Sequence, residues 1–352
     1  MFKDPICGMV VENKKVTFEF EGKKFFFCSQ GCKDQFKNSP DKFSQKYLYD
    51  LVIIGGGPAG LTAAVYASIS RIDTFLITSD IGGQAIDSTK IKNYMGFDFI
   101  TGGELTQKFK EQFLHEHYLM HKIDEVLKIG RKDKSFEVIT RGGIKVFSKA
   151  IIIATGMKKR KLGIPGEDRL QRKGISYSSV QDISLFSGMD VIVIGGGNSG
   201  VQTANDLKRI CHSVRLISKG NLIADQKDID ALKEGNKVEI LDKHDVIEIK
   251  GEEKVEGVVV NPEENGEYKD ISCQGVFIQV GFLPNTEFCQ GLVNLNEYGE
   301  IIISPDCSTN IDGIFACGDV TNAFGKRIVI ASGEGAKATL SARKYLANRE
   351  GD

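Results

Sequence analysis

The fold is decided by the stretch Asp50-Leu-Val-Ile-Ile-Gly-Gly-Gly-Pro-Ala-Gly60. Residues 51–54 (Leu-Val-Ile-Ile) form a short continuous apolar run, which is typical of a strand buried on both faces. Gly55, Gly57 and Gly60 then give the spacing G-x-G-x-x-G, and residues 61–68 have the composition of a helix. A strand, a glycine turn and a helix in this order predict a dinucleotide site. The turn lets the backbone approach a pyrophosphate, and the helix N-terminus offers free N–H groups to the phosphates.

The same signal returns in the stretch Asp190-Val-Ile-Val-Ile-Gly-Gly-Gly-Asn-Ser-Gly200. Another apolar strand ends in a glycine turn, and residues 201–210 are expected to form the helix that follows. One glycine pattern is a weak signal, whereas two in one chain, each between a strand and a helix, predict two bound nucleotides. We therefore expect an α/β protein with two Rossmann-like dinucleotide-binding domains.

Length and composition are those of an ordinary globular protein with more than one domain. The chain has 352 residues, of which 41% are hydrophobic and 26% are charged, and its net charge is −1. This charge predicts neither nucleic acid nor a membrane as partner, and no apolar run reaches the ~18 residues of a membrane span. The N-terminus lacks the apolar core of a secretory signal, so we expect a cytoplasmic protein. The eight cysteines are too sparse for a disulfide scaffold, which favours reactive or metal-binding thiols.

Residues 1–46 are expected to form a separate unit that carries Cys7, Cys28 and Cys32. A β-hairpin is predicted between the first two cysteines, followed by a short helix that would hold the third. This pattern resembles the YHS family of small, treble-clef-like metal-binding modules. The resemblance implies a metal held by the three cysteines. Three thiolates suit Cu(I) or another soft metal, whereas Zn(II) would need a fourth ligand such as Asp4 or water.

The module departs from the YHS family at one position, and an alternative without metal stays open. Phe27 stands where the histidine that gives the family its name would lie. A unit of this size has little core of its own, so a bound metal would help it to fold. The pattern fixes only the spacing of the thiols, and the alternative is a vestigial module whose thiols hold no metal.

The rest of the chain resembles the low-molecular-weight thioredoxin reductase family of FAD- and NAD(P)-dependent pyridine nucleotide-disulfide oxidoreductases. Besides the glycine turns, four motifs carry the resemblance: Gly82-Gly-Gln-Ala85, Asn93-Tyr-Met-Gly-Phe97, Ala154-Thr-Gly156 and Gly313-Ile-Phe-Ala-Cys-Gly-Asp-Val320. They follow the family's order over residues 48–350. The resemblance implies an FAD domain split by an inserted nicotinamide domain, and it implies a homodimer.

The resemblance also implies domain limits and site residues. The domains would be a YHS-like module at 1–46, the first part of the FAD domain at 47–159, the NAD(P) domain at 160–283 and the second part of the FAD domain at 284–352. The residues placed against FAD are Gly55, Gly57, Pro58, Ala59, Gly60, Gly83, Gln84, Asn93, Ala154, Thr155, Gly156, Gly318, Asp319, Arg327, Ile328 and Val329. Those placed against NAD(P) are Gly195, Gly197, Asn198, Ser199, Gly200 and Lys219.

The redox-active cysteine pair of thioredoxin reductases is absent from this sequence. The family has Cys-x-x-Cys-Asp shortly before the second glycine turn. This chain has Ser178 and Gln181 at the two cysteine positions, followed by Asp182. Serine and glutamine cannot form a disulfide or attack one as a thiolate. The usual relay from flavin through a cysteine pair to thioredoxin is therefore closed, and no catalytic residue is assigned.

We expect an FAD-dependent NAD(P)H oxidoreductase that passes electrons directly from the flavin to an acceptor. The acceptor would be a soft metal, a small molecule or a small protein docked at the N-terminal thiol module. Two alternatives stay open: a flavin or metal redox sensor without fast turnover, and a disulfide reductase that uses the N-terminal cysteines. The donor stays open between NADH, weakly bound NADPH and no nicotinamide. The family's arginine cluster has shrunk to Lys219, and the acidic residue of an NAD site is also absent.

Overall fold

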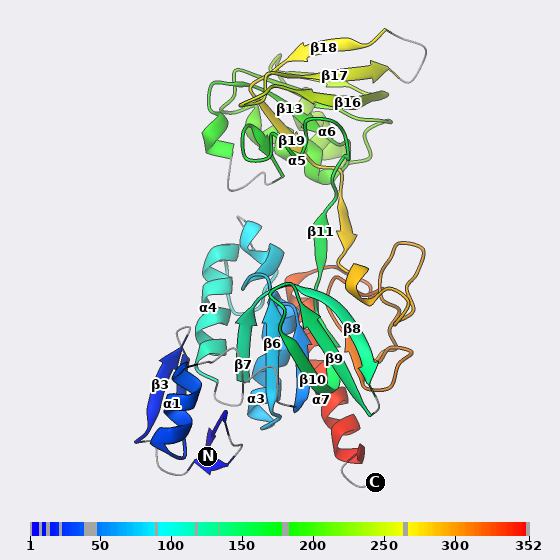
Figure 1. Ribbon diagram of the computed structural model, residues 1–352. Coiled ribbons are helices and arrows are strands. Elements are labelled where there is room, and N and C mark those ends of the chain that lie inside the picture. Colours follow the sequence, from blue (N-terminus) through cyan, green and yellow to red (C-terminus); the bar gives the residue numbers. More distant parts are fainter. Residues whose placement is uncertain are drawn as a thin grey trace. The chain divides into compact units, whose positions relative to one another are not determined.

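The computed structural model describes residues 2–6, 9–11, 15–20, 23–38, 48–88, 91–116, 119–132, 134–177, 183–262 and 267–349 (Figure 1). The chain divides into two compact units. The first consists of Met1–Met157 together with Pro284–Asp352, and the second consists of Lys158–Leu283. The chain enters the second unit through β11 (Met157–Lys159) and leaves it through β20 (Phe282–Pro284). Within the described ranges, no helix combines the length and the apolar character that a membrane crossing requires.

A seven-stranded sheet forms the centre of the first unit. Its strands are β5 (Leu48–Ile54), β6 (Thr74–Thr78), β7 (Leu119–Ile123), β8 (Val126–Lys132), β9 (Ser135–Thr140), β10 (Lys145–Ile153) and β21 (Ile314–Ala316). The order is β7-β6-β5-β10-β9-β8, and β21 pairs with the second half of β10. Strands β7, β6, β5, β10 and β21 run parallel, whereas β8 and β9 form an antiparallel arm. The parallel strands therefore end at the same edge of the sheet.

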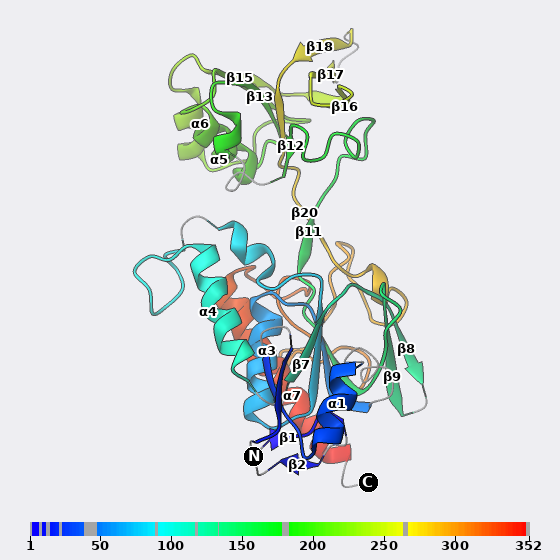
Figure 2. The ribbon, with the colours of Figure 1, turned by 60° about the vertical axis from the view of Figure 1, so that its left-hand side comes forward.

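Helices α3 (Pro58–Ile69) and α7 (Ile328–Arg349) pack closely against each other in the first unit (Figure 2). A Cβ on Gly335 would lie 2.1 Å from the carbonyl oxygen of Ala59, so only a glycine allows this approach of the two backbones. The buried alanines that the two helices contribute to this core are Ala59, Ala63, Ala64, Ala67, Ala331, Ala338 and Ala342. This contact brings the first turns of α7 next to the start of α3.

Helix α4 (Gly102–Leu114) begins at a capping box. The Thr101 side chain accepts the N–H of Glu104 at 3.2 Å, and the Glu104 carboxylate accepts the N–H of Thr101 at 3.0 Å. Both bonds satisfy N–H groups that a helix start leaves unpaired. The short 3-10 helix η1 (Gly83–Asp87) lies just before α4 in the chain, and a Cβ on Gly102 would lie 1.9 Å from the Ala85 carbonyl oxygen. A further 3-10 helix, η3 (Glu287–Cys289), follows β20.

The second unit contains a five-stranded parallel sheet and a three-stranded antiparallel sheet. The parallel sheet has the order β12-β19-β13-β14-β15, with β12 (Ile175–Ser176), β13 (Asp190–Ile194), β14 (Ser213–Ile217), β15 (Val238–Leu241) and β19 (Gly275–Ile278). The antiparallel sheet contains β16 (His244–Lys250), β17 (Gly257–Pro262) and β18 (Lys269–Ser272). The helices are η2 (Ile183–Phe186), α5 (Asn198–Leu207) and α6 (Gln226–Lys233). The expected α/β fold with two Rossmann-like domains is confirmed.

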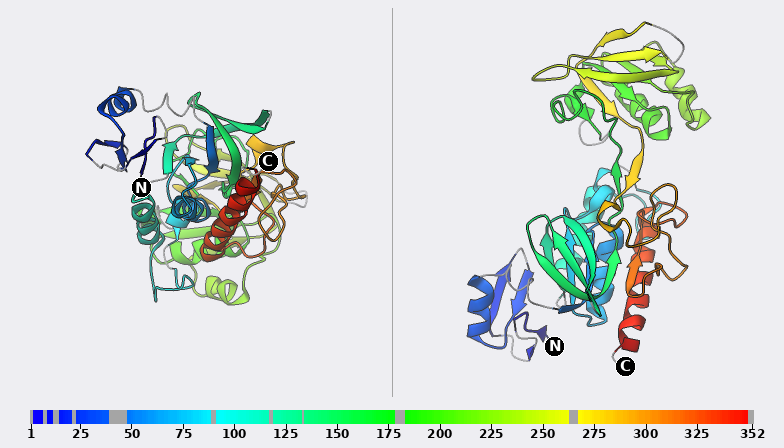
Figure 3. Two further views of the ribbon diagram at one scale, coloured as in Figure 1. Left: turned by 90° about the horizontal axis from the view of Figure 1, so that it is seen from below. Right: turned by 45° about the vertical axis from the view of Figure 1, so that its right-hand side comes forward.

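The N-terminal module contains the predicted hairpin and helix (Figure 3). Its elements are β1 (Phe2–Lys3), β2 (Val10–Val11), β3 (Thr17–Phe20), β4 (Lys23–Phe26) and α1 (Gln30–Asn38). Phe25, Phe27 and Phe36 form its core, and the rings of Phe27 and Phe36 are 5.4 Å apart. Phe27 is only 1% exposed. The residue that replaces the family's histidine is thus a core residue of the module.

Candidate nucleotide and metal sites

The first glycine turn (Gly55–Gly60) joins β5 to α3 and leaves one side open. Gly55 has a φ of +113°, which an L side chain rarely adopts. A Cβ on Gly60 would lie 1.9 Å from the carbonyl oxygen of Gly55, so the close packing of turn and helix needs a glycine there. Gly57 differs, because nothing lies within 4 Å of the place that its Cβ would take. This open space adjoins the N-terminus of α3, where free N–H groups attract phosphate.

The late Gly-Asp motif lies beside this turn. Gly318 has a φ of +75°, and a Cβ there would lie 2.9 Å from the Cβ of Ala59 in α3. Asp319 is partly buried. Burial raises the pKa of its carboxyl, and the charges of Lys326 and Arg327 partly offset the rise. A partly buried carboxylate next to a glycine turn is a suitable acceptor for a sugar hydroxyl.

Glu334 of α7 holds the Gly-Asp motif in place, a role that sequence reasoning missed. Its Oε2 accepts the N–H of Gly318 at 2.7 Å, and the side chain is 9% exposed. Burial raises the pKa of Glu334, and the bond from Gly318 partly offsets the rise. One feature of the sequence could have indicated this role. Glu334 is the one acidic residue among the small and apolar residues 328–335, which begin the closing helix.

Asn285 links the Ala-Thr-Gly segment after β10 to the segment after β20. The Thr155 hydroxyl donates to the Asn285 carbonyl at 2.7 Å, and the Asn285 side-chain amide donates to the Thr155 carbonyl at 2.9 Å. The N–H of Asn285 also donates to the Gly156 carbonyl at 3.0 Å. Gln84 donates to the carbonyl of Met157, the residue that follows Gly156. Two residues expected at FAD, Thr155 and Gly156, therefore bond to Asn285, a residue that sequence reasoning assigned no role.

Four further residues expected at FAD lie on two segments of the first unit. Asn93 is exposed in the loop between η1 and α4. Arg327, Ile328 and Val329 are at the start of α7, and Arg327 donates to the carbonyl of Lys326 at 2.8 Å. Helix α7 thus carries Ile328, Val329 and the Glu334 that accepts the N–H of Gly318, and Arg327 directly precedes it. The open glycine turn, the partly buried carboxylate and the two helix starts fit the phosphates and sugar of FAD.

The second glycine turn (Gly195–Gly200) repeats the geometry of the first. Gly195 has a φ of +129°, and a Cβ on Gly200 would lie 1.9 Å from the Gly195 carbonyl oxygen. Gly197 again has nothing within 4 Å of its Cβ position. Asn198 and Ser199 are exposed at the start of α5. This turn therefore fits a second dinucleotide, in agreement with the repeated sequence motif.

Lys219, the remaining basic residue after β14, is paired with an acid. Its Nζ lies 2.8 Å from Oδ2 of Asp245 in β16, and both side chains are exposed. Asp245 is 26 residues further along the chain and belongs to no motif, so sequence reasoning offered no sign of it.

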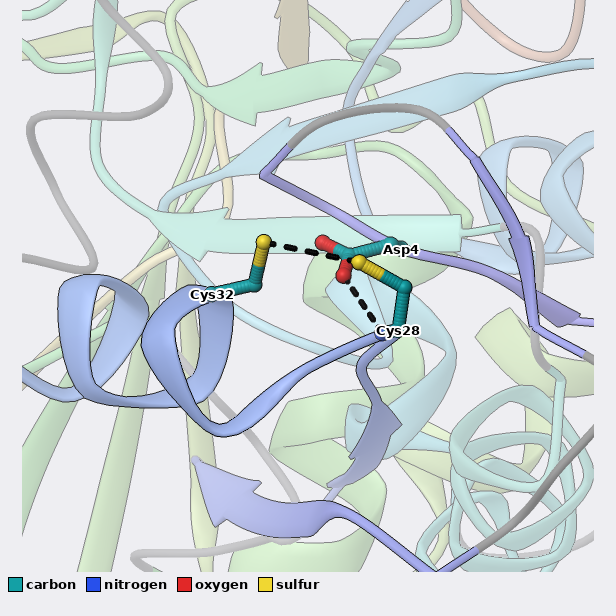
Figure 4. Close-up of side chains that lie close together, drawn as sticks. All are labelled: Asp4, Cys28 and Cys32. Atoms are coloured by element: carbon teal, nitrogen blue, oxygen red, sulfur yellow. Dashed lines mark hydrogen bonds between the residues drawn. The ribbon is translucent and has the colours of Figure 1, made fainter.

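The N-terminal module brings one carboxylate and two thiols together, as Figure 4 shows. The ligand atoms of Asp4, Cys28 and Cys32 all lie within 4.8 Å of one another, and the two sulfurs are 3.7 Å apart. Asp4 is 1% exposed and accepts the N–H groups of Cys28 and Ile6, each at 2.7 Å. Burial would raise the pKa of Asp4, but hydrogen bonds from Cys28, Ile6 and Cys32 outweigh it and the pKa is lowered. The predicted ligand Cys7 lies outside the described residues.

The other described cysteines are buried and stay protonated. Burial raises the pKa to about 11 for Cys211 and Cys307, to about 12 for Cys273 and Cys289, and well above its ordinary value for Cys317. Among the cysteines in the described ranges, only the two of the N-terminal cluster reach solvent.

The segment that replaces the family's cysteine pair, with Ser178, Gln181 and Asp182, lies outside the described residues. The chain just before it is anchored, because the Tyr177 hydroxyl donates to Glu167 at 2.5 Å. Glu167 also accepts two backbone N–H groups from residues 162–163. The sequence alone therefore shows that the cysteine pair is absent. The structure adds only that the residue before this segment, Tyr177, is held by Glu167.

Comparison with known proteins agrees with this geometry. Residues 49–337 match the pyridine nucleotide-disulphide oxidoreductase family, and residues 2–47 match the YHS domain. The chain therefore belongs to the pyridine nucleotide-disulphide oxidoreductase family and carries a YHS domain at its N-terminus. It is an oxidoreductase with a thioredoxin reductase-like fold, and its family implies FAD and a nicotinamide dinucleotide as cofactors.

Solved structures and curated relatives place the chain within the family. Thioredoxin reductase from Lactococcus lactis is 36% identical, covers 85% of this chain and 99% of its own, and has a TM-score of 0.76. Thioredoxin reductase from T. acidophilum is 33% identical, covers 84% of this chain and 98% of its own, and has a TM-score of 0.72. A component of the alkyl hydroperoxide reductase of Escherichia coli is 38% identical over 88% of this chain. The NADH dehydrogenase of Ferdinandcohnia aciditolerans is 35% identical over 89%. The chain spans 60% of the length of each of these two relatives.

Proposed function

We propose that this chain is an FAD-dependent NAD(P)H oxidoreductase whose flavin passes electrons to an acceptor without a cysteine pair in the nicotinamide domain. The observation that carries the proposal is the repeated glycine turn. Gly57 and Gly197 each leave open space at a helix start, which suits two dinucleotides. The sequence supplies both turns but has Ser178 and Gln181 in place of the redox pair.

The residues of the chain would bind and orient the cofactors. When bound, FAD would accept a hydride from the reduced nicotinamide and hand electrons on to an acceptor. Asp319 would hold a ribityl hydroxyl, and Glu334 would keep Asp319 in position through the bond to Gly318. Thr155 and Gly156 would form the neighbouring wall, fixed by Asn285.

The N-terminal cluster supports a soft metal as acceptor or as part of the acceptor site. Cys28 and Cys32 supply two sulfur ligands, and the buried Asp4 supplies an oxygen ligand already held by two backbone N–H groups. Two thiolates and a carboxylate suit Zn(II), which undergoes no redox change and would only form part of the acceptor site. A third thiolate from Cys7 would shift the preference towards a softer ion such as copper, whose Cu(II) form can take up an electron from the flavin.

A second candidate is a dithiol that accepts electrons as a disulfide. It is favoured by the contact of 3.7 Å between the sulfurs of Cys28 and Cys32. Reduction would break the S–S bond, take up two electrons and two protons and leave two thiols. This version needs no metal, and the reduced dithiol would pass its two electrons to the disulfide of a partner protein or of a small molecule.

Counting electrons separates these candidates. In an anaerobic titration of metal-free, air-oxidised protein, a flavin alone consumes one equivalent of NADH, whereas a flavin coupled to a disulfide consumes two. The Cys28→Ser variant should return the count to one if the dithiol is the acceptor. A count of one in the unchanged protein rules the dithiol out.

Metal binding and turnover test the first candidate. Cys28→Ser and Asp4→Asn should weaken the binding of Zn(II) and Cu(I), while Asp34→Asn changes an exposed acid of α1 and serves as the matched control. Steady-state NADH oxidation is then measured with soft metal ions, a disulfide and an alkyl hydroperoxide, the last because of the named relative. Slow turnover with every acceptor, despite full reduction of the flavin, would contradict the proposal that the protein is an enzyme and would favour a redox sensor.

A further inference from the structure

The loop after β14 lies directly against the second glycine turn. A Cβ on Gly196 would lie 2.2 Å from the hydroxyl oxygen of Ser218, which is 5% exposed. The N–H of Ile223 donates to the Gly196 carbonyl at 2.9 Å, and the N–H of Asp225 donates to the Asn198 side chain at 2.7 Å. Residues 218–225 therefore border the place where the adenosine ribose of a dinucleotide would lie, because the end of this strand is where ribose is recognised in such folds.

The turn between β15 and β16 is fixed beside the same loop. The N–H of Ser218 donates to the Leu241 carbonyl and the N–H of His244 donates to the Ser218 carbonyl, each at 3.0 Å. The ring of His244 lies 2.7 Å from the Asp242 carbonyl oxygen, which closes the turn. The next residue, Asp245, then meets Lys219 at 2.8 Å. The carboxylate is thus held at the end of β14 by a strand outside the parallel sheet.

We propose that Asp245 determines the choice of donor by excluding the 2′-phosphate of NADPH, so that NADH is the substrate. The inference rests on the proposed function and refines its nicotinamide site. Lys219 is the basic residue left at the position where the family's arginines stand, and the Asp245 carboxylate cancels its charge. A 2′-phosphate brings nearly two further negative charges to this pair. A ribose 2′-hydroxyl brings none and can donate to a carboxylate.

The pair is exposed, so its effect is moderate and depends on salt. Removing the carboxylate charge leaves a lysine that can attract phosphate. The expected gain in NADP⁺ affinity for Asp245→Asn is about tenfold, since one added unit charge at a few ångström from phosphate near a surface has an effect of that order. The gain in affinity should shrink as the salt concentration rises from about 50 mM to about 500 mM, because salt screens the attraction between exposed charges.

The experiment measures the dissociation constants of NAD⁺ and NADP⁺ by calorimetry on the FAD-loaded protein. For Asp245→Asn we expect NADP⁺ to bind about tenfold more tightly and NAD⁺ affinity to change less than about twofold. Asp270→Asn is the matched control, because Asp270 in β18 is also exposed and paired with a lysine, Lys250, at 2.7 Å. Adding Lys219→Ala to Asp245→Asn should abolish the gain.

Three results would overturn the inference. Unchanged protein could bind NADP⁺ as tightly as NAD⁺, Asp245→Asn could leave the ratio of the two constants unaltered, or the gain could survive the loss of Lys219. In each case NAD⁺ still binds, and the proposed function stands. If neither nucleotide binds, and neither reduced form bleaches the flavin, the proposed function fails together with the inference.

Discussion

Replacing Gly57 by alanine separates nucleotide binding from folding. Gly57 has a φ of −76° and a ψ of −176°, an extended conformation that any residue adopts. Nothing in the described part of the protein lies within 4 Å of the new methyl group. Alanine also restricts the unfolded chain more than glycine does. The free energy of unfolding of the flavin-free protein should therefore stay the same or rise by about 0.4–1 kcal/mol.

The affinity for FAD should change in the opposite direction. The methyl group would occupy the space through which a phosphate reaches the N–H groups at the start of α3. The loss of one hydrogen bond to a charged group amounts to about 1.5–3 kcal/mol. This corresponds to a dissociation constant about 10- to 150-fold higher.

The assay uses flavin-free protein and two measurements. Urea unfolding gives the stability, and quenching of flavin fluorescence during titration gives the dissociation constant of FAD. Gly60→Ala is the comparison, because its Cβ would lie 1.9 Å from the Gly55 carbonyl oxygen and both stability and binding should be lost. A Gly57→Ala protein that binds FAD unchanged, or that loses as much stability as Gly60→Ala, would refute this reasoning.

Four further predictions concern Glu334, the cysteines and the cap of α4. Glu334→Ala leaves the buried N–H of Gly318 without its acceptor and should lower the stability by about 1–3 kcal/mol. Glu334→Gln keeps an acceptor for this N–H and removes a buried charge. Burial raises the pKa of Glu334, so ionisation of this side chain destabilises the unchanged protein above that pKa. The free energy of unfolding of Glu334→Gln, relative to that of the unchanged protein, should therefore be highest at neutral pH and fall as the pH drops through that pKa. Thiol labelling at about pH 8 should modify Cys28 and Cys32 fast and the five buried described cysteines slowly, and equal rates would contradict the burial. Thr101→Ala removes the cap of α4 and should lower the midpoint of urea unfolding by an amount equivalent to about 1 kcal/mol, and an unchanged midpoint would show that the capping box adds nothing.

Much of the fold was predictable because its signals are local. The apolar runs of β5 and β13 and the glycine spacing after them are features of a few consecutive residues, and both strands appear where they were expected. The helix after the second turn was predicted at residues 201–210 but begins at Asn198 and ends at Leu207. The reason is that the last residues of the glycine motif already form the first turn of the helix.

The parts of the sites that could not be predicted depend on contacts between distant segments. Glu334 lies 16 residues after Gly318 and accepts its N–H, and Asn285 meets Thr155 across 130 residues. Asp245 faces Lys219 only because β16 folds back beside β14. No spacing rule reports such pairs. Local motifs thus predicted where nucleotides would bind, and the tertiary fold brought further residues, Glu334, Asn285 and Asp245, against those segments.

Two glycine turns that would hold a flavin and its reduced nicotinamide donor in one chain are the basis of the proposed function. The decisive test is an anaerobic titration of the FAD-loaded protein with NADH, followed by flavin absorbance, for the unchanged chain and for Gly197→Ala. We expect that the unchanged flavin bleaches stoichiometrically, and that Gly197→Ala keeps its flavin but needs a large excess of NADH, because only the second turn is blocked. A flavin that neither NADH nor NADPH bleaches, or a Gly197→Ala protein that titrates like the unchanged one, would contradict the proposed function.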